Sequence, residues 1–271
     1  RYPLHHGLQG IQSKRGMTGP NHNPFLALAR QGTTEENGEA YGVGLVYSGN
    51  FALDAEVNTK GSTRVLAGIN PEEFRWHLGP GEAFTTPEAV MVYSSQGLGG
   101  MSRTFHRFYM HHLMRSEWAL KKRPLLINSW EAAFFDFDDE KLVEFARAAK
   151  DLGIEMLVMD DGWFGGRCDD HRALGDWQVN EEKLKGGLGS LIKRVNDLGV
   201  KFGIWYEPEM INPDSDLYRA HPDWAVCAPG RGKSLSRFQC VLDMTRQDVR
   251  DNIFGQMYEV ISKNNIEYIK W

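Results

Sequence analysis

The chain of 271 residues lacks several features that mark particular classes of protein. Its 31 Lys and Arg nearly balance its 36 Asp and Glu, which gives a net charge of -5 without a block of like charge. Surfaces that bind nucleic acid or anionic membranes need clustered Lys and Arg, so neither partner is expected. No stretch approaches the roughly 18 consecutive apolar residues of a membrane span, and the mean hydropathy is -0.45.

Cysteine is also scarce. The three cysteines, Cys168, Cys227 and Cys240, are odd in number and widely spaced. This pattern fits neither a disulfide framework nor a set of zinc ligands. The first six residues contain no apolar region of the signal-peptide kind. We therefore expect a reducing compartment, and hence a cytoplasmic location.

Glycine and tryptophan are abundant instead, with 29 and 8 residues. Glycine is 29 of 271 residues, about 11%, against the usual ~7%. This composition indicates many turns and a functional site lined by aromatic side chains.

Residues 1–100 show turn signals every eight to twelve residues and little helical periodicity. This pattern predicts an antiparallel β-sandwich. Because the strand-like pattern is present from the first residue, we expect further strands before residue 1. The predicted strands are Tyr41–Tyr47, Phe51–Val57, Thr63–Ile69 and Ala89–Tyr93.

Residues 101–122 are predicted to form a connector helix, with Phe105, Phe108 and Leu113 among the apolar residues at helical spacing. Three histidines also fall in this segment, which raises the alternative of a metal site. No carboxylate or thiol stands at ligand spacing with them, so the sequence favours packed or solvated histidines and predicts no metal and no cofactor.

Residues 123–271 alternate between buried strands and helices, which predicts a parallel sheet covered by helices. Helix-to-strand joints are short and strand-to-helix connections long, as in the first half, strands one to four, of a (β/α)8 TIM barrel. A Rossmann-like sheet is the competitor, but no Gly-x-Gly-x-x-Gly follows the first strand. The predicted strands are Pro124–Trp130, Ile154–Met159, Val200–Tyr206 and Ile266–Trp271, and the predicted helices are Asp139–Leu152, Leu188–Leu198 and Asp248–Lys263.

The predicted strands end in tryptophans and charged groups. Trp130 follows the first strand, Asp160 and Asp161 the second, Trp205 the third, and Lys270 the fourth. Flat aromatic faces and carboxylates that accept paired hydrogen bonds suit a sugar ring. Two alternatives remain at this level: a divalent-cation site at the aspartate pair, and an acid–base pair formed by the two glutamates of Glu207–Glu209.

Longer blocks then identify a resemblance. Asp-Asp-Gly-Trp-Phe-Gly at 160–165, Trp-Tyr-Glu-Pro-Glu-Met at 205–210 and Tyr-Ile-Lys-Trp at 268–271 closely resemble α-galactosidases of glycoside hydrolase family 36. Residues 23–29 and 42–50 are similar to the later part of that family's N-terminal β-supersandwich. The resemblance covers essentially the whole chain and implies the C-terminal part of a β-supersandwich domain over 1–100 and the first half of a catalytic barrel over 123–271.

The resemblance also implies a mechanism and roles for individual residues. The family is retaining, with one carboxylate as nucleophile and one as acid/base. The nucleophile is expected directly after Trp271, so that no catalytic carboxylate is expected within the chain. Glu207 and Glu209 are implied to be structural. The implied substrate-binding residues are Trp130, Asp160, Asp161, Trp205, Arg237 and Lys270.

The implied substrates are oligosaccharides with a terminal α-linked galactose, and the implied assembly is a homo-oligomer, often a tetramer. Cys168 and Cys227 are expected in loops near the pocket. The residues leave open α-N-acetylgalactosaminidase and galactosyl-transfer activities, a metal-dependent hydrolase, and a non-catalytic sugar-binding or assembly module.

Overall fold

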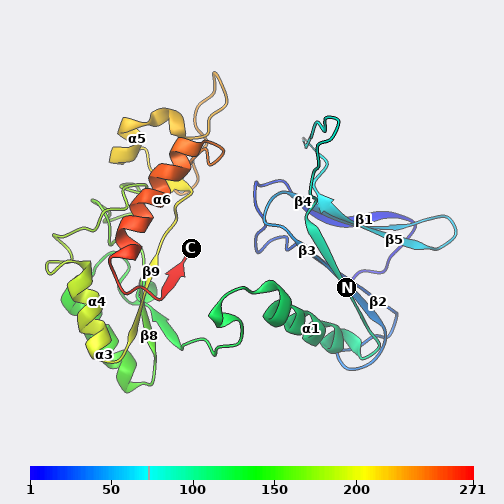
Figure 1. The fold of residues 1–271 in the computed structure, drawn as a ribbon, viewed down its shortest axis with the longest axis horizontal. Coiled ribbons are helices and arrows are strands. Elements are labelled where there is room, and N and C mark those ends of the chain that lie inside the picture. Colours follow the sequence, from blue (N-terminus) through cyan, green and yellow to red (C-terminus); the bar gives the residue numbers. More distant parts are fainter. Residues whose placement is uncertain (73) are drawn as a thin grey trace. The chain divides into compact units, whose positions relative to one another are not determined.

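The computed structural model describes residues 1–72 and 74–271. They form two compact units, Arg1–Lys122 and Arg123–Trp271 (Figure 1). No helix within these described ranges has the length and apolar character to cross a membrane.

The first unit contains two antiparallel sheets of three strands each, as the turn-rich sequence predicts. In one sheet, β4 (Phe51–Val57) lies between β1 (Gly7–Ser13) and β5 (Thr63–Ile69). In the other, β3 (Ala40–Val46) lies between β2 (Phe25–Ala29) and β6 (Glu88–Ser94). Side chains alternate along β4, so that Phe51, Leu53 and Ala55 are buried.

Helix α1 (Gly97–Phe108) packs Met101 and Phe105 against Ala40 of β3. A Cβ at Gly42 would lie 2.4 Å from Cε2 of Phe105, so glycine permits this close approach. The helix begins earlier than the expected residue 101 and does not reach residue 122. It continues as a π-helical turn at Tyr109–Leu113 and is followed by a separate 3-10 turn at Glu117–Ala119.

The second unit contains a four-stranded parallel sheet, part of an α/β barrel, in the order β12-β9-β8-β7. Its three longest helices are α3, α4 and α6, and α3 and α4 lie side by side (Figure 1). The bounds are β7 Leu126–Asn128, α3 Asp139–Asp151, β8 Met156–Met159, α4 Leu188–Asp197, β9 Lys201–Trp205, α6 Gln247–Ser262 and β12 Tyr268–Lys270. Each strand is shorter than predicted, and Trp130 begins the short helix α2 (Trp130–Ala133) instead of ending β7.

The two faces of this sheet differ because neighbouring side chains point to opposite sides. One face packs against the helices through Ile127, Leu157, Met159, Phe202, Ile204 and Ile269. Asn128 and Lys270 each neighbour one of these residues along their strand, so their side chains point to the other face. Asp160, directly after β8, lies on that face as well. The polar groups therefore gather at the carboxyl ends of the strands, the edge at which α/β barrels hold their active sites.

Glycines make the joints at the amino ends of the strands short. Gly153 follows α3 with φ 76° and Gly199 follows α4 with φ 81°, both in the left-handed conformation that ends helices. The loop after β9 is long and contains a two-stranded antiparallel ladder, β10 (Met210–Ile211) with β11 (Cys240–Val241), and the helix α5 (Asp216–Ala220).

Candidate functional site

Asp160 lies at the centre of the polar groups at the strand ends. Its Oδ2 accepts hydrogen bonds from Nδ2 of Asn128 and from Nζ of Lys270, both at 2.6 Å. Its Oδ1 accepts a bond from the backbone N–H of Asp161. The Asp160 side chain is 5% exposed, whereas that of Lys270 is 44% exposed. The carboxylate is thus fixed in orientation, and the ammonium beside it remains open to a ligand.

The Asp161 carboxylate forms a buried ion pair with Arg167, a residue that the sequence did not single out. Nε of Arg167 donates to Oδ1 at 2.9 Å and Nη2 donates to Oδ2 at 2.7 Å, a bidentate geometry of the strong kind. Burial raises the pKa of Asp161, and the hydrogen bonds and charge of Arg167 oppose that shift. Each carboxylate oxygen keeps further acceptor capacity, so the pairing fixes Asp161 without exhausting it.

Lys183 links the loops that follow β7 and β8. Its Nζ donates to the backbone carbonyls of Phe135 and Gly162, at 2.8 and 2.9 Å. The ammonium lies 4.3 Å from the ring centroid of Phe137. Burial lowers the pKa of Lys183. The turn that carries Asp160 and Asp161 is therefore anchored to the loop that follows Trp130 in the sequence.

The tryptophans at the strand ends separate into two groups. Trp163 and Trp177 are buried in the core. Trp130 and Trp205 are half-buried. The Trp130 ring meets Phe135 edge-on, and the backbone carbonyl of Trp205 accepts a hydrogen bond from Nε1 of Trp163. The half-buried pair is exposed enough to stack on a ligand, whereas Trp163 and Trp177 are not.

Glu207 and Glu209 have separate partners. Glu207 is half-buried and accepts a hydrogen bond from Nε2 of Gln239 at 3.3 Å. Burial raises the pKa of Glu207, and the positive charge of Arg237 opposes the shift. Glu209 accepts a bond from Nε1 of Trp271 at 2.8 Å. Arg237 itself is exposed, in a tight turn before β11.

Among the residues that the structure describes, no group of three or more His, Cys, Asp and Glu is arranged to hold a metal ion. Cys168 and Cys227 are exposed in their loops, and Cys240 is buried. The Cys227 thiol donates to the carbonyl of Arg231 at 3.2 Å.

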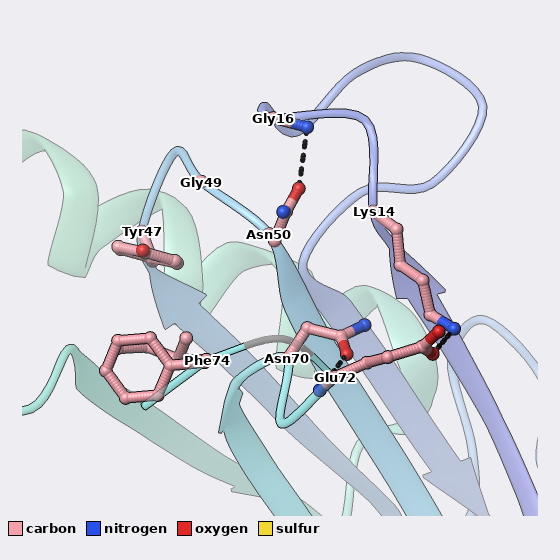
Figure 2. A pocket seen from close by; sticks show the side chains of 9 residues that line it. Lys14, Gly16, Tyr47, Gly49, Asn50, Asn70, Glu72 and Phe74 are labelled. Atoms are coloured by element: carbon pink, nitrogen blue, oxygen red, sulfur yellow. Dashed lines mark hydrogen bonds and ion pairs between the residues drawn. The ribbon is translucent and has the colours of Figure 1, made fainter. Parts of the chain in front are cut away.

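The first unit has a hollow of about 570 Å³ at the ends of its strands (Figure 2). Tyr47 and Phe74 line it, and its polar side chains bond to neighbours: Lys14 pairs with Glu72, and Oδ1 of Asn50 accepts from the backbone N–H of Gly16 at 2.6 Å. A second hollow, of about 790 Å³, lies between α6 and residues 177–181. Neither is lined by Asp160 or Asp161, so the candidate site rests on the chemistry of the strand ends.

Two family models match the sequence. The model for the glycosyl hydrolase family 36 N-terminal domain matches residues 1–79, and the model for melibiase matches residues 83–271. α-Galactosidase AgaA of Geobacillus stearothermophilus is 52% identical over the whole chain. The chain spans 37% of that relative's length.

Solved structures of α-galactosidases are also similar to this chain. An AgaA variant crystallised with raffinose has a TM-score of 0.95 at 52% identity, over 99% of this chain and 38% of its own. The α-galactosidase of Lactobacillus brevis has a TM-score of 0.96 at 47% identity, over 100% of this chain and 36% of its own.

Proposed function

The chain belongs to glycosyl hydrolase family 36, and on that basis we propose that the protein is a retaining α-galactosidase in which this chain supplies the galactose-recognising groups. The observation that carries the proposal is the Asp160 carboxylate, fixed between Asn128 and Lys270 at the carboxyl ends of the strands. A charged acceptor in a fixed position distinguishes the axial 4-hydroxyl of galactose from the equatorial one of glucose, because hydrogen bonds to ionised groups are strong and directional.

In this proposal Asp160 and Asp161 accept hydrogen bonds from the 4- and 6-hydroxyls. The burial of both side chains supports the assignment, since a bond to a desolvated carboxylate discriminates more than one exposed to water. The half-exposed ammonium of Lys270 donates to a further hydroxyl, and Arg237 donates from its loop. Trp130 and Trp205 supply flat walls for the apolar face of the ring.

Hydrolysis requires two carboxylates, a nucleophile and an acid/base. The nucleophile is proposed to follow Trp271 directly, which would bring it close to Lys270. The Lys270 charge would then help to keep that carboxylate ionised at neutral pH. Glu207 and Glu209 bind to Gln239 and Trp271, and these separate partners favour a structural role for both.

The proposed substrates are oligosaccharides that end in α-linked galactose, such as raffinose, the sugar bound in the AgaA variant. Assembly into a homo-tetramer and a cytoplasmic location remain predictions.

The test is hydrolysis of an aryl α-galactoside by the full-length protein, followed by proton NMR from the first turnovers. Retention predicts that α-galactose appears first and then equilibrates with the β anomer. Initial release of β-galactose would contradict the retaining mechanism. Absence of hydrolysis, with heat released on titration of galactose, would instead favour the non-catalytic sugar-binding module.

A further inference from the structure

The turn that carries Arg237 has an unusual backbone. Ser236 and Gln239 exchange two backbone hydrogen bonds, at 3.2 and 3.0 Å, which closes a two-residue hairpin. Both central residues are left-handed, Arg237 with φ 51° and Phe238 with φ 62°. This geometry is that of a type I′ turn, which favours Asn-Gly because side chains with a Cβ strain it. Contacts outside the turn must therefore stabilise it.

Asn212 provides the main contact of this kind. It follows β10 directly, next to the β11 strand that leaves the turn, and it is fully buried. Its Nδ2 donates to the carbonyl of Phe238 at 2.9 Å and to the carbonyl of Asp170 at 3.1 Å. The amide group thereby ties the centre of the strained turn to the loop that follows β8.

The oxygen of the same amide is linked to Asp161 through Arg167. Oδ1 of Asn212 accepts from Nη1 of Arg167 at 2.9 Å and from the backbone N–H of Leu174 at 3.0 Å. The remaining nitrogens of Arg167 hold both oxygens of Asp161. Two pure donors on one side and two carbonyls on the other fix the orientation of the amide and satisfy all four of its hydrogen-bonding positions.

A stacked pair at the surface adds to this anchor. The rings of His171 and Phe238 lie with centroids 3.6 Å apart and planes at 24°. The loop after β8 thus holds the turn through a side chain as well as through Asn212.

We propose that Asn212 is a positioning residue for sugar recognition. It fixes the turn that carries Arg237 relative to the Arg167–Asp161 pair. The proposal rests on the α-galactosidase function and deepens it, because both residues that Asn212 positions are assigned there to the galactose ring. Asn212 itself touches no reacting group.

The substitution Asn212→Asp separates the two halves of the network. A carboxylate keeps the bonds from Arg167 and Leu174 but cannot donate to the carbonyls of Phe238 and Asp170, so the turn loses its anchor while Asp161 remains paired. In the full-length protein we expect KM for an aryl α-galactoside to rise about tenfold with little change in kcat, as for the loss of ground-state binding.

A double variant distinguishes positioning from a general effect on folding. If Asn212 acts through Arg237, Asn212→Asp raises KM in the wild-type background but by less than about twofold in the Arg237→Ala background. Adding Phe238→Gly to Asn212→Asp should restore KM in part, because glycine adopts the left-handed conformation without strain. Asn212→Ser, which also lacks the amide donor pair, replaces Asn212→Asp if that variant fails to accumulate.

Asn196→Asp is the matched control. Asn196 donates to the carbonyl of Val200 at the amino end of β9, away from the strand ends that carry the site. The KM of the Asn196→Asp variant should therefore equal that of the wild type. Full multiplication of the two KM effects, or an unchanged KM in Asn212→Asp, would overturn the proposal while the wild type remains active. A wild type inactive on α-galactosides would overturn the proposed function and this inference with it.

Discussion

Asp160 and Lys270 are 110 positions apart in the sequence, yet Oδ2 of one and Nζ of the other lie 2.6 Å apart. β9 lies between the two strands that carry them, and the lysine side chain reaches across its end. The pair exists only because the sheet brings the carboxyl ends of its parallel strands to one edge.

Removing either member of this pair should weaken catalysis. In the full-length protein we expect Lys270→Met and Asp160→Asn each to lower kcat/KM for an aryl α-galactoside about 10- to 150-fold, since a hydrogen bond to a charged group contributes about 1.5–3 kcal/mol. Lys193→Met, which removes an exposed lysine from the outer helix α4, is the control and should leave kcat/KM unchanged. Wild-type kinetics in Lys270→Met would exclude this lysine from the site.

The Arg167–Asp161 pair should be important for stability. Arg167→Met leaves a buried carboxylate without its counterion, which costs about 3–5 kcal/mol of unfolding free energy. Urea unfolding followed by tryptophan fluorescence measures the loss. The double variant Arg167→Met with Asp161→Asn should recover part of it, because no unpaired charge remains. An equal loss in both variants would mean that packing, not charge, explains the effect.

Lys183 should stabilise the turn that carries the aspartates. Lys183→Met keeps the apolar stem beside Phe137 but leaves the carbonyls of Phe135 and Gly162 without a donor, at a cost of about 1–3 kcal/mol. The melting temperature and kcat/KM should fall together. Lys185→Met, at an exposed position two residues on, is the matched control. A stable but inactive Lys183→Met protein would point to direct contact with substrate instead.

Glu207 should make stability depend on pH with a defined sign. Burial raises its pKa above the ordinary value of 4.5, so the native state holds this proton more tightly than the unfolded state. Its contribution to stability is therefore lost as pH rises from the ordinary value through the raised one. We expect Glu207→Gln to gain stability relative to wild type as the pH rises above 4.5. A difference that stays constant across this range would contradict the assigned pKa direction.

Much of the fold follows from local sequence patterns. The strands Phe51–Val57 and Thr63–Ile69 are confirmed residue for residue, because alternating side chains flank the tight turn at Lys60–Gly61. The barrel strands were predicted too long. Their predicted ends lie past the last ladder pair, as at Trp130, where the chain already turns into the helix α2.

The candidate site was predicted only in part. Residues directly at strand ends, such as Asp160 and Lys270, follow from the shared edge of a parallel sheet. Asn128 has the same position at the end of β7 and could have been included on that argument. Arg167 and Asn212 could not, because their partners depend on the paths of long loops that no periodicity describes.

The most direct test of the account is the discrimination between an aryl α-galactoside and its α-glucoside epimer, measured as the ratio of kcat/KM in wild type and in Asp160→Asn. If Asp160 accepts a hydrogen bond from the axial 4-hydroxyl, kcat/KM of the wild type is at least about a hundredfold higher for the galactoside, and the variant loses most of that preference. Equal turnover of the two epimers by the wild type, or a preference that survives Asp160→Asn intact, would contradict the account.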